Sequence, residues 1–285
     1  MRPNYITDPF LKQFIDSALS EDVGSGDHSS LASVSDKTLS HAKLIIKDNG
    51  VLAGVELAVE IFAQFDPTLR IEKSVNDGDT VKKGEIAFLV KGKARSILTT
   101  ERLVLNCMQR MSGIATLTNR LVKLVEGTGV KLLDTRKTTP NFRMLEKWAV
   151  LIGGGFNHRL GLYDMIMLKD NHIEMAGGIE KAIIRTKEYL RANKLDLKIE
   201  VETRNLKEVE QVVRIGGVDV IMLDNMELSE MKEAVSLISG NFTTEASGGI
   251  TEQTIRDVAL CGVDFISVGA LTHSVKSLDL SLKQF

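Results

Sequence analysis

The sequence predicts an α/β protein whose larger, C-terminal part is a parallel barrel. Two observations lead to this prediction. Beyond residue 130, short apolar runs recur at regular intervals, and helical patterns lie between them. Four successive runs end at Glu202, Asp224, Ser247 and Gly269, which are 22, 23 and 22 residues apart. A strand, a turn and a helix repeated at this spacing form the βα unit of a parallel barrel.

The predicted barrel strands are continuous apolar runs, as expected for strands that are buried on both faces. They cover residues 130–134, 165–169, 199–202, 220–224, 243–247 and 265–269. Helical patterns at 206–215 and 228–238 fill two of the intervals. Chemistry in such barrels gathers where strands end and the next loops begin, so the polar residues at these ends are candidates for the site.

The first part of the chain predicts mixed α and β structure. Apolar residues recur at helical spacing over 9–22, before a glycine-rich turn at 24–27. Strand-like runs at 42–46 and 71–75 flank a helical pattern at 55–65. Residues 96–125 predict a long helix. This part is therefore expected to form an α+β domain of its own.

Length and composition restrict the class of protein. A chain of 285 residues favours one large domain with a smaller one. The 36 Lys and Arg residues against 38 Asp and Glu residues leave a net charge of −2, so we expect neither nucleic acid nor a membrane as partner. No apolar segment reaches membrane-span length, and the two cysteines lack metal-ligand spacing. A cytoplasmic protein is expected.

A group of basic side chains lies between residues 134 and 172. Long cationic side chains often coat a solvated face. Several of these, however, follow predicted strand ends and should point into one barrel mouth. Arginine binds carboxylates bidentately there, and lysine or histidine adds point charge, so the group predicts a site for a small polyanion. Its members are Arg136, Lys137, Arg143, Lys147, His158, Arg159, Lys169 and His172.

Two acidic residues, Glu202 and Asp224, close successive predicted strands. Burying a carboxylate is costly unless a cation or hydrogen bonds compensate for it. One interpretation is that both pair with the basic group. The other is that they bind Mg²⁺, which prefers one or two carboxylates together with substrate phosphates and water.

Glycines accompany the last two strand ends, at 246–249 and 267–270. Backbone N–H groups at such loops, aimed from the start of a helix, can hold a phosphate, and late barrel strands commonly do so. The cationic group, the carboxylate pair and the glycine loops together predict an enzyme that uses a phosphorylated sugar and a small anionic partner.

Several strings along the chain carry a family resemblance. They are 21–27 (EDVGSGD), 101–102 (ER) followed by 112–116 (SGIAT), 134–138 (DTRKT), 157–162 (NHRLGL), 168–172 (LKDNH), 200–202 (EVE), 245–249 (EASGG) and 267–270 (SVGA). In this order, and over nearly the whole chain, they resemble the quinolinate phosphoribosyltransferases, a family of type II phosphoribosyltransferases.

The resemblance implies an N-terminal open-faced α/β sandwich and a C-terminal incomplete α/β barrel. We expect the first domain at 1–109, with 271–285 packing back on it, and the barrel at 110–270. The resemblance also implies a homodimer with shared active sites, or a hexamer assembled from such dimers.

The activity implied is the Mg²⁺-dependent conversion of quinolinate and phosphoribosyl pyrophosphate to nicotinate mononucleotide, pyrophosphate and CO₂ in de novo NAD biosynthesis. Carried over by position, the quinolinate pocket consists of Arg102 from the neighbouring subunit, Arg136, His158, Arg159 and Lys169. The phosphoribosyl pyrophosphate site consists of Lys137, Glu202, Asp224, Ser247, Gly248, Gly269 and His273. Lys137, Lys169, Glu202 and Asp224 would be catalytic, and Glu202 and Asp224 would bind Mg²⁺.

Three alternatives stay open on the sequence alone. A phosphoribosyltransferase that acts on nicotinate would meet a monocarboxylate and need fewer cations. A relative associated with molybdenum transport shares the same resemblance. A non-catalytic barrel that senses phosphosugars would keep Ser247 and Gly269 but would not need Glu202, Asp224 and Lys169 together.

Overall fold

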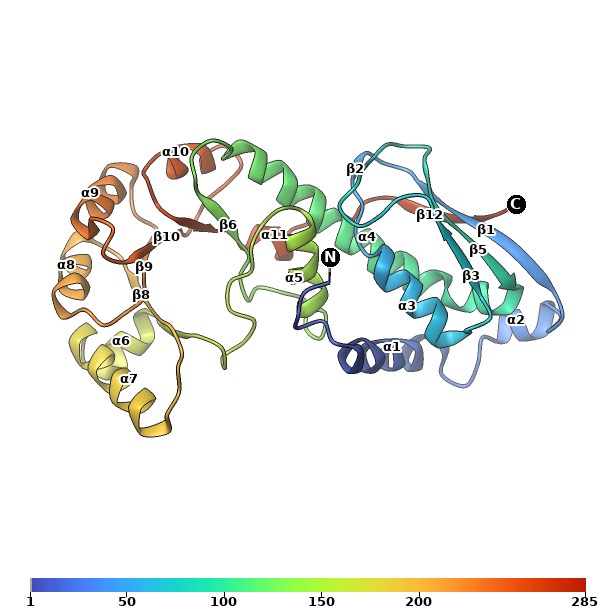
Figure 1. Cartoon of the computed structure of the whole chain (residues 1–285), viewed down its shortest axis with the longest axis horizontal. Coiled ribbons are helices and arrows are strands. Elements are labelled where there is room, and N and C mark those ends of the chain that lie inside the picture. Colours follow the sequence, from blue (N-terminus) through green and yellow to red (C-terminus); the bar gives the residue numbers. More distant parts are fainter. Residues whose placement is uncertain (1) are drawn as a thin grey trace. The chain divides into compact units, whose positions relative to one another are not determined.

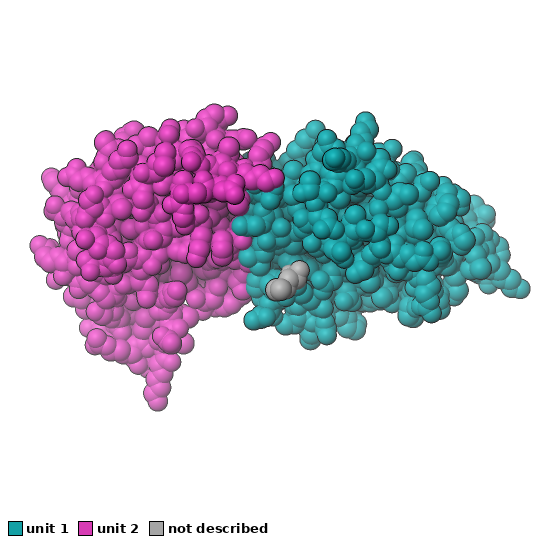
Figure 2. All heavy atoms as spheres, turned by 45° about the horizontal axis from the view of Figure 1, so that its top comes forward, with its two compact units in different colours: residues 1–119, 139–154, 271–285 teal, residues 120–138, 155–270 magenta. Residues whose placement is uncertain are grey.

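The computed structural model describes residues 2–285. Contacts divide the chain into two compact units, coloured teal and magenta in Figure 2. Unit 1 combines the residues up to 119 with 139–154 and 271–285, and unit 2 combines 120–138 with 155–270. The sequence-based boundary is at 109, so residues 110–119 and 139–154 of unit 1 come from the predicted barrel segment.

Unit 1 contains a four-stranded antiparallel sheet with the strand order β12-β1-β5-β3. The strands are β1 (Leu39–Ile46), β3 (Arg70–Lys73), β5 (Ile86–Lys93) and β12 (Leu280–Gln284). A two-stranded sheet of β2 (Gly50–Val51) and β4 (Thr80–Val81) accompanies it. Ala42, Leu44 and Ile46 alternate with more exposed residues along β1, so one face of the sheet is buried. The strand predicted at 42–46 is confirmed as part of β1, and the strand predicted at 71–75 overlaps β3 at residues 71–73.

Helices pack on the unit 1 sheet. Phe62 of α3 meets Phe88 of β5 edge to face, with ring centroids 6.1 Å apart. Figure 1 shows α1 beside α3, which it contacts. Thr7 caps α1 by accepting a hydrogen bond from the Phe10 N–H. The helices lying wholly or mostly in unit 1 are α1 (Asp8–Val23), α2 (His28–Ser33), α3 (Val55–Phe65), α4 (Ala94–Leu124), α5 (Arg143–Ile152) and α11 (Ala270–His273).

Unit 2 contains a six-stranded parallel sheet with the order β6-β11-β10-β9-β8-β7. The strands are β6 (Lys131–Leu133), β7 (Ile166–Leu168), β8 (Ile199–Thr203), β9 (Val220–Asp224), β10 (Thr243–Ser247) and β11 (Phe265–Ser267). Sequence neighbours are therefore spatial neighbours, and the chain order becomes circular between β11 and β6. Among the described residues no ladder joins β6 to β7, so the barrel is incomplete, as the family resemblance implies.

Helices surround the barrel strands on the outside, and Figure 1 shows α8, α9 and α10 in this position. They are α6 (Asp170–Ala176), α7 (Ile179–Asn193), α8 (Leu206–Ile215), α9 (Leu228–Ile238) and α10 (Ile255–Ala259). The helices predicted at 206–215 and 228–238 are confirmed with the same bounds. Buried Val209 and Val212 explain the orientation of α8, because residues three apart share one helix face. No helix in the described part of the chain has the length and apolar character that a bilayer span requires.

Candidate active site

The carboxyl ends of β8, β9 and β10 bring the predicted strand-end residues of unit 2 together. Asp224 and Ser247 are partners in the register of β9 and β10. On the neighbouring strand β8, Glu202 pairs with Met222 of β9. Met222 stands two residues before Asp224. The Nζ of Lys169, at the start of α6, lies 3.1 Å from Oε2 of the buried Glu202. A cation and two carboxylates thus meet at one end of the barrel.

The loop after β10 depends on a glycine. Gly248 has a φ of +92°, and a Cβ at this position would lie 2.3 Å from Oδ1 of Asn225. Asn225 in turn donates from its backbone N to the Ser247 carbonyl (2.8 Å) and from Nδ2 to Asp224 Oδ2 (2.8 Å). Only glycine gives the loop both this backbone conformation and this space. Asn225 therefore connects the metal-binding candidate Asp224 to the glycine loop.

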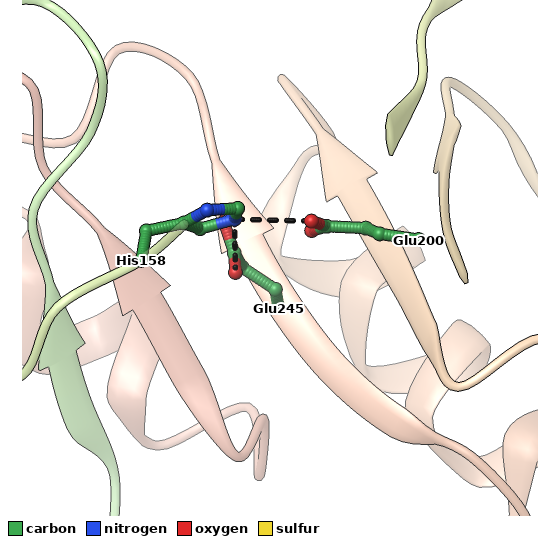
Figure 3. A group of neighbouring side chains, drawn as sticks. All are labelled: His158, Glu200 and Glu245. Carbon is green, nitrogen blue, oxygen red and sulfur yellow. Dashed lines mark ion pairs between the residues drawn. The ribbon is translucent and has the colours of Figure 1, made fainter. Parts of the chain in front are cut away.

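A second layer of polar residues lies deeper in the barrel. Glu200 stands two residues before Glu202, and Glu245 two residues before Ser247, so each projects to the same side as its functional neighbour. Both carboxylates are buried. Figure 3 shows them converging on the imidazole of His158, whose Nε2 lies 3.0 Å from Glu200 Oε2 and 3.5 Å from Glu245 Oε2.

The cluster of His158, Glu200 and Glu245 raises the pKa of its imidazole. Burial alone would lower the pKa of His158, but hydrogen bonds and negative charge from Glu200 and Glu245 outweigh it and raise that pKa to about 9. Burial also raises the pKa of Glu200. The Arg159 N–H donates to Nδ1 (2.7 Å), so Nδ1 carries no hydrogen in this arrangement and the ring hydrogen lies on Nε2, toward the two carboxylates. His158, Glu200 and Glu245 offer side-chain atoms of the kinds that bind metal ions. Nε2 carries a hydrogen, however, and so has no lone pair for a metal ion.

The charge of His158 can be measured by nuclear magnetic resonance. We expect its ring signals, identified by their loss in His158→Gln, to titrate with a midpoint near pH 9. In Glu245→Gln the midpoint should move down, because burial then opposes the charge against one carboxylate fewer. A midpoint at the ordinary value of about 6.5 in the unsubstituted protein would contradict the assigned role of the carboxylates.

Two arginines lie close together beside this cluster. Arg159 donates to the Met165 carbonyl (3.1 Å) and is near Met167 Sδ (3.6 Å). Burial and then the charge of Arg136 lower the pKa of Arg159. Arg136 forms no ion pair among the described residues, and its Nε is buried without a hydrogen-bond partner there. Two guanidinium groups of like charge, one of them lacking a carboxylate, are the arrangement expected of an anion site.

The backbone around His158 is fixed by Asp134, directly after β6. Its buried carboxylate accepts from the His158 N–H (2.9 Å) and from Asn157 Nδ2 (2.6 Å). Phe156 also forms a parallel bridge with Leu133 of β6. Residues 157–159 therefore leave the same edge of the sheet as the segment that carries Arg136, which explains how two distant strings reach one place.

Two family models match the chain. The model of the quinolinate phosphoribosyl transferase N-terminal domain matches residues 27–112, and that of the C-terminal domain matches residues 114–283. The chain belongs to the quinolinate phosphoribosyltransferase family.

Relatives and solved structures agree with this assignment. The chain is 50% identical over 288 residues to quinolinate phosphoribosyltransferase (decarboxylating) 1b of Nicotiana tabacum, covering 96% of this chain and 82% of that protein. It is 40% identical over 272 residues to the probable nicotinate-nucleotide pyrophosphorylase (carboxylating) of Bacillus subtilis, covering 95% and 92%. The crystal structure of NadC from Streptococcus pyogenes superposes with a TM-score of 0.92 at 40% identity, covering 98% of this chain and 97% of that one.

The remaining residues expected from the family resemblance lie as follows. Lys137 is exposed in the segment after β6, and Gly269 follows β11. Arg102 is exposed on α4, and His273 is exposed at the end of α11, both in unit 1. That these four residues contribute to one site remains a prediction.

Other members of the predicted basic group lie elsewhere or act locally. Lys147 is fully buried in α5 of unit 1, as is Glu146 beside it, and Arg143 begins that helix. His172 accepts a hydrogen bond from the Lys169 N–H (3.0 Å), and this bond caps the start of α6.

Four residues of the site were not predicted from the sequence: Glu200, Glu245, Asn225 and Asp134. A signal for the first two was present, because charged residues at alternate positions of an apolar run point to one face of a strand. Asp134 ends a predicted strand and opens the DTRKT string, but no pattern indicated its hydrogen bonds to residues 157 and 158. Nothing in the sequence marked Asn225, whose role comes from a hydrogen bond to another loop.

Proposed function

We propose that this chain joins quinolinate to phosphoribosyl pyrophosphate with the aid of Mg²⁺ and releases pyrophosphate and CO₂, forming nicotinate mononucleotide in de novo NAD biosynthesis. The observation that carries the proposal is the approach of Arg136 to Arg159, together with Glu202 and Asp224 at the carboxyl ends of β8 and β9. A dianion and a phosphorylated sugar each find suitable partners there. The names of the relatives support the same reaction.

The quinolinate pocket is assigned to Arg136, His158, Arg159 and Lys169, with Arg102 from a second subunit. Quinolinate carries two adjacent carboxylates, and the paired guanidinium groups offer bidentate hydrogen bonds to both. The buried side chain of His158 is a further basic group of this pocket, and Glu200 and Glu245 raise its pKa. A monocarboxylate would leave part of this charge without a partner, which favours quinolinate over nicotinate.

Mg²⁺ fits the residues at the ends of β8 and β9. Carboxylate oxygens of Glu202 and Asp224 are the hard ligands that Mg²⁺ takes, usually one or two from protein and the rest from phosphate and water. Glu202 already faces a cation, Lys169, at 3.1 Å, so this end of the barrel accepts positive charge. When bound, Mg²⁺ neutralises the charge that gathers on the departing pyrophosphate.

The chain's own residues perform three tasks in the transfer. Ser247, Gly248, Gly269 and His273 are assigned to hold the phosphates, and the cationic pocket holds the pyridine, so two anions that repel in water are fixed face to face. As the bond to pyrophosphate breaks, positive charge develops on the ribose ring. The carboxylates of Glu202 and Asp224 stabilise that charge, because they are placed before the reaction begins.

Decarboxylation follows from the chemistry of the pyridinium. The ring nitrogen attacks the ribose carbon, pyrophosphate leaves with the bonding electrons, and the nitrogen becomes positively charged. The adjacent carboxylate then leaves as CO₂, and its electron pair stays at the ring carbon, where the pyridinium stabilises it. A proton must replace the CO₂, and Lys137 and Lys169 are the two lysines at the strand ends that can deliver it.

We further propose a homodimer with composite active sites, or a hexamer built from such dimers. We also propose that the protein works in a reducing compartment such as the cytoplasm. The exposed Arg102 on α4 of unit 1, far in sequence from the barrel strand ends, supports a site completed by a second subunit. Cys107 and Cys261 are both free and buried, which supports a reducing environment.

The proposal is tested by offering the protein two acceptors. With Mg²⁺ and phosphoribosyl pyrophosphate, quinolinate should give nicotinate mononucleotide, whereas nicotinate at the same concentration should give at most about a hundredth of that rate. Chromatography of the nucleotide products measures both. Equal rates, or product from nicotinate alone, would contradict the assignment of a dicarboxylate pocket.

A further inference from the structure

An ion pair in unit 1 has no role in the steps of the proposed reaction. Arg110 of α4 donates from Nε (3.0 Å) and Nη2 (2.9 Å) to Oε1 of Glu146 on α5. Glu146 is fully buried, and the Arg110 side chain is 24% exposed. Helices α4 and α5 are thereby connected at one point.

The same two side chains hold two loops. Glu146 accepts from the Thr139 N–H at Oε2 (3.0 Å) and from the Thr139 hydroxyl at Oε1 (2.9 Å). Arg110 donates from Nη2 to the Thr272 carbonyl and from Nη1 to the Val275 carbonyl (3.4 Å). Every one of these residues belongs to unit 1, so the network lies within one compact body.

These loops are the two places where the chain returns from the barrel strands to unit 1. It leaves unit 2 after Thr138, past β6, and again after Ala270, past β11. Lys137 stands two residues before Thr139, and His273 directly follows Thr272. The ion pair is therefore bonded to both segments that carry these candidates for the phosphoribosyl pyrophosphate site.

Stability alone does not account for such a pair. The cost of removing both charges from water offsets most of their attraction, so a buried ion pair is commonly no better than apolar packing. Its hydrogen bonds, in contrast, are directional, and an apolar pair could not reproduce four contacts to two separate backbone segments. The arrangement specifies the position of the loops.

We propose that Arg110 and Glu146 are positioning residues that set the loops after β6 and β11 for binding of phosphoribosyl pyrophosphate. This inference rests on the proposed function, because Lys137 and His273 are assigned to that substrate. Neither Arg110 nor Glu146 contacts the reacting atoms in this account. They act through the backbone at Thr139 and at 272–275.

Thr139 offers a mild test, because it is exposed and its substitution leaves no cavity. Thr139→Val removes the hydroxyl that donates to Glu146 and keeps the backbone N–H. We expect the KM for phosphoribosyl pyrophosphate to rise about fivefold, with a smaller change in the KM for quinolinate. Thr139→Ser restores the hydroxyl and should return the KM to within about twofold of the parent value.

Glu146→Gln is the stronger variant, since an uncharged amide cannot satisfy both Arg110 and Thr139. We expect its KM for phosphoribosyl pyrophosphate to rise about tenfold or more. The matched control is Asp66→Asn, which changes another buried carboxylate of unit 1 bonded to a threonine N–H (3.0 Å) and hydroxyl (2.6 Å). It should lower the thermal midpoint by a similar amount and leave both KM values near those of the parent.

The outcomes separate this inference from the proposed function. Unchanged KM values in Thr139→Val and Glu146→Gln, with a lowered midpoint in the latter, would overturn the positioning role and leave the activity standing. If the parent protein forms no nicotinate mononucleotide, the proposed function fails. Calorimetric affinity for phosphoribosyl pyrophosphate then decides the inference, because a tenfold loss in Glu146→Gln supports it. Equal affinity in both proteins, or no binding by either, overturns it.

Discussion

Replacing Glu202 with glutamine is expected to lower turnover by about a hundredfold to a thousandfold, the range seen when one preorganised electrostatic group is removed from a transition state. The substitution keeps the shape of the side chain and removes the charge that faces Lys169 at 3.1 Å. Asp224→Asn should act in the same direction. Both proteins should remain folded, because the amide can still accept and donate hydrogen bonds at these strand ends.

The control for Glu202→Gln is Glu208→Gln on α8. Glu208 also pairs with a cation, Arg204, at 2.9 Å, but it lies at the start of an outer helix. Turnover of Glu208→Gln should stay within about twofold of the parent, since exposed ion pairs contribute little. Near-normal turnover in both Glu202→Gln and Asp224→Asn would refute the roles assigned to these carboxylates.

The second large effect concerns the composite site. Arg102→Ala and Glu202→Ala should each give a nearly inactive homodimer, because every site then lacks one essential group. A heterodimer of the two variants collects both defects in one site and leaves the other site with its native Arg102 and Glu202. Activity should therefore return when the two inactive proteins are mixed and allowed to exchange subunits.

The amount of recovered activity is predictable. Random pairing of equal amounts gives about half heterodimers, each with one intact site of two, so about a quarter of the parent activity should return. Native mass spectrometry confirms that heterodimers have formed. If they form and activity stays at the level of the separate variants, Arg102 acts within its own subunit or not at all, and the shared site is wrong.

Much of the fold could be predicted because the barrel strands are buried on both faces. The runs at 199–202, 220–224 and 243–247 recur at a constant interval, and the helices at 206–215 and 228–238 have a clear apolar face. The circular strand order was implied by that repetition. The return of 139–154 to unit 1 was not, because it depends on contacts of α5 with residues distant in sequence.

The residues at the strand ends of the candidate site were predicted, whereas the buried layer below them was missed. Glu202, Asp224 and Ser247 were recognisable because they end the apolar runs that predict these strands. Glu200 and Glu245 were hidden inside strands that were interpreted as apolar, although their two-residue spacing from Glu202 and Ser247 indicates the same face. Their meaning depends on His158, which arrives from a segment held by Asp134, and such long-range hydrogen bonds have no local sequence pattern.

One site is proposed both to transfer the phosphoribosyl group and to release CO₂. The most direct test supplies quinolinate labelled with ¹³C in the carboxylate next to the ring nitrogen, with Mg²⁺, in the presence and absence of phosphoribosyl pyrophosphate. We predict that labelled CO₂ appears only with phosphoribosyl pyrophosphate and in a one-to-one ratio with nicotinate mononucleotide. Release of labelled CO₂ without phosphoribosyl pyrophosphate, or a nucleotide product that keeps the label, would contradict the account.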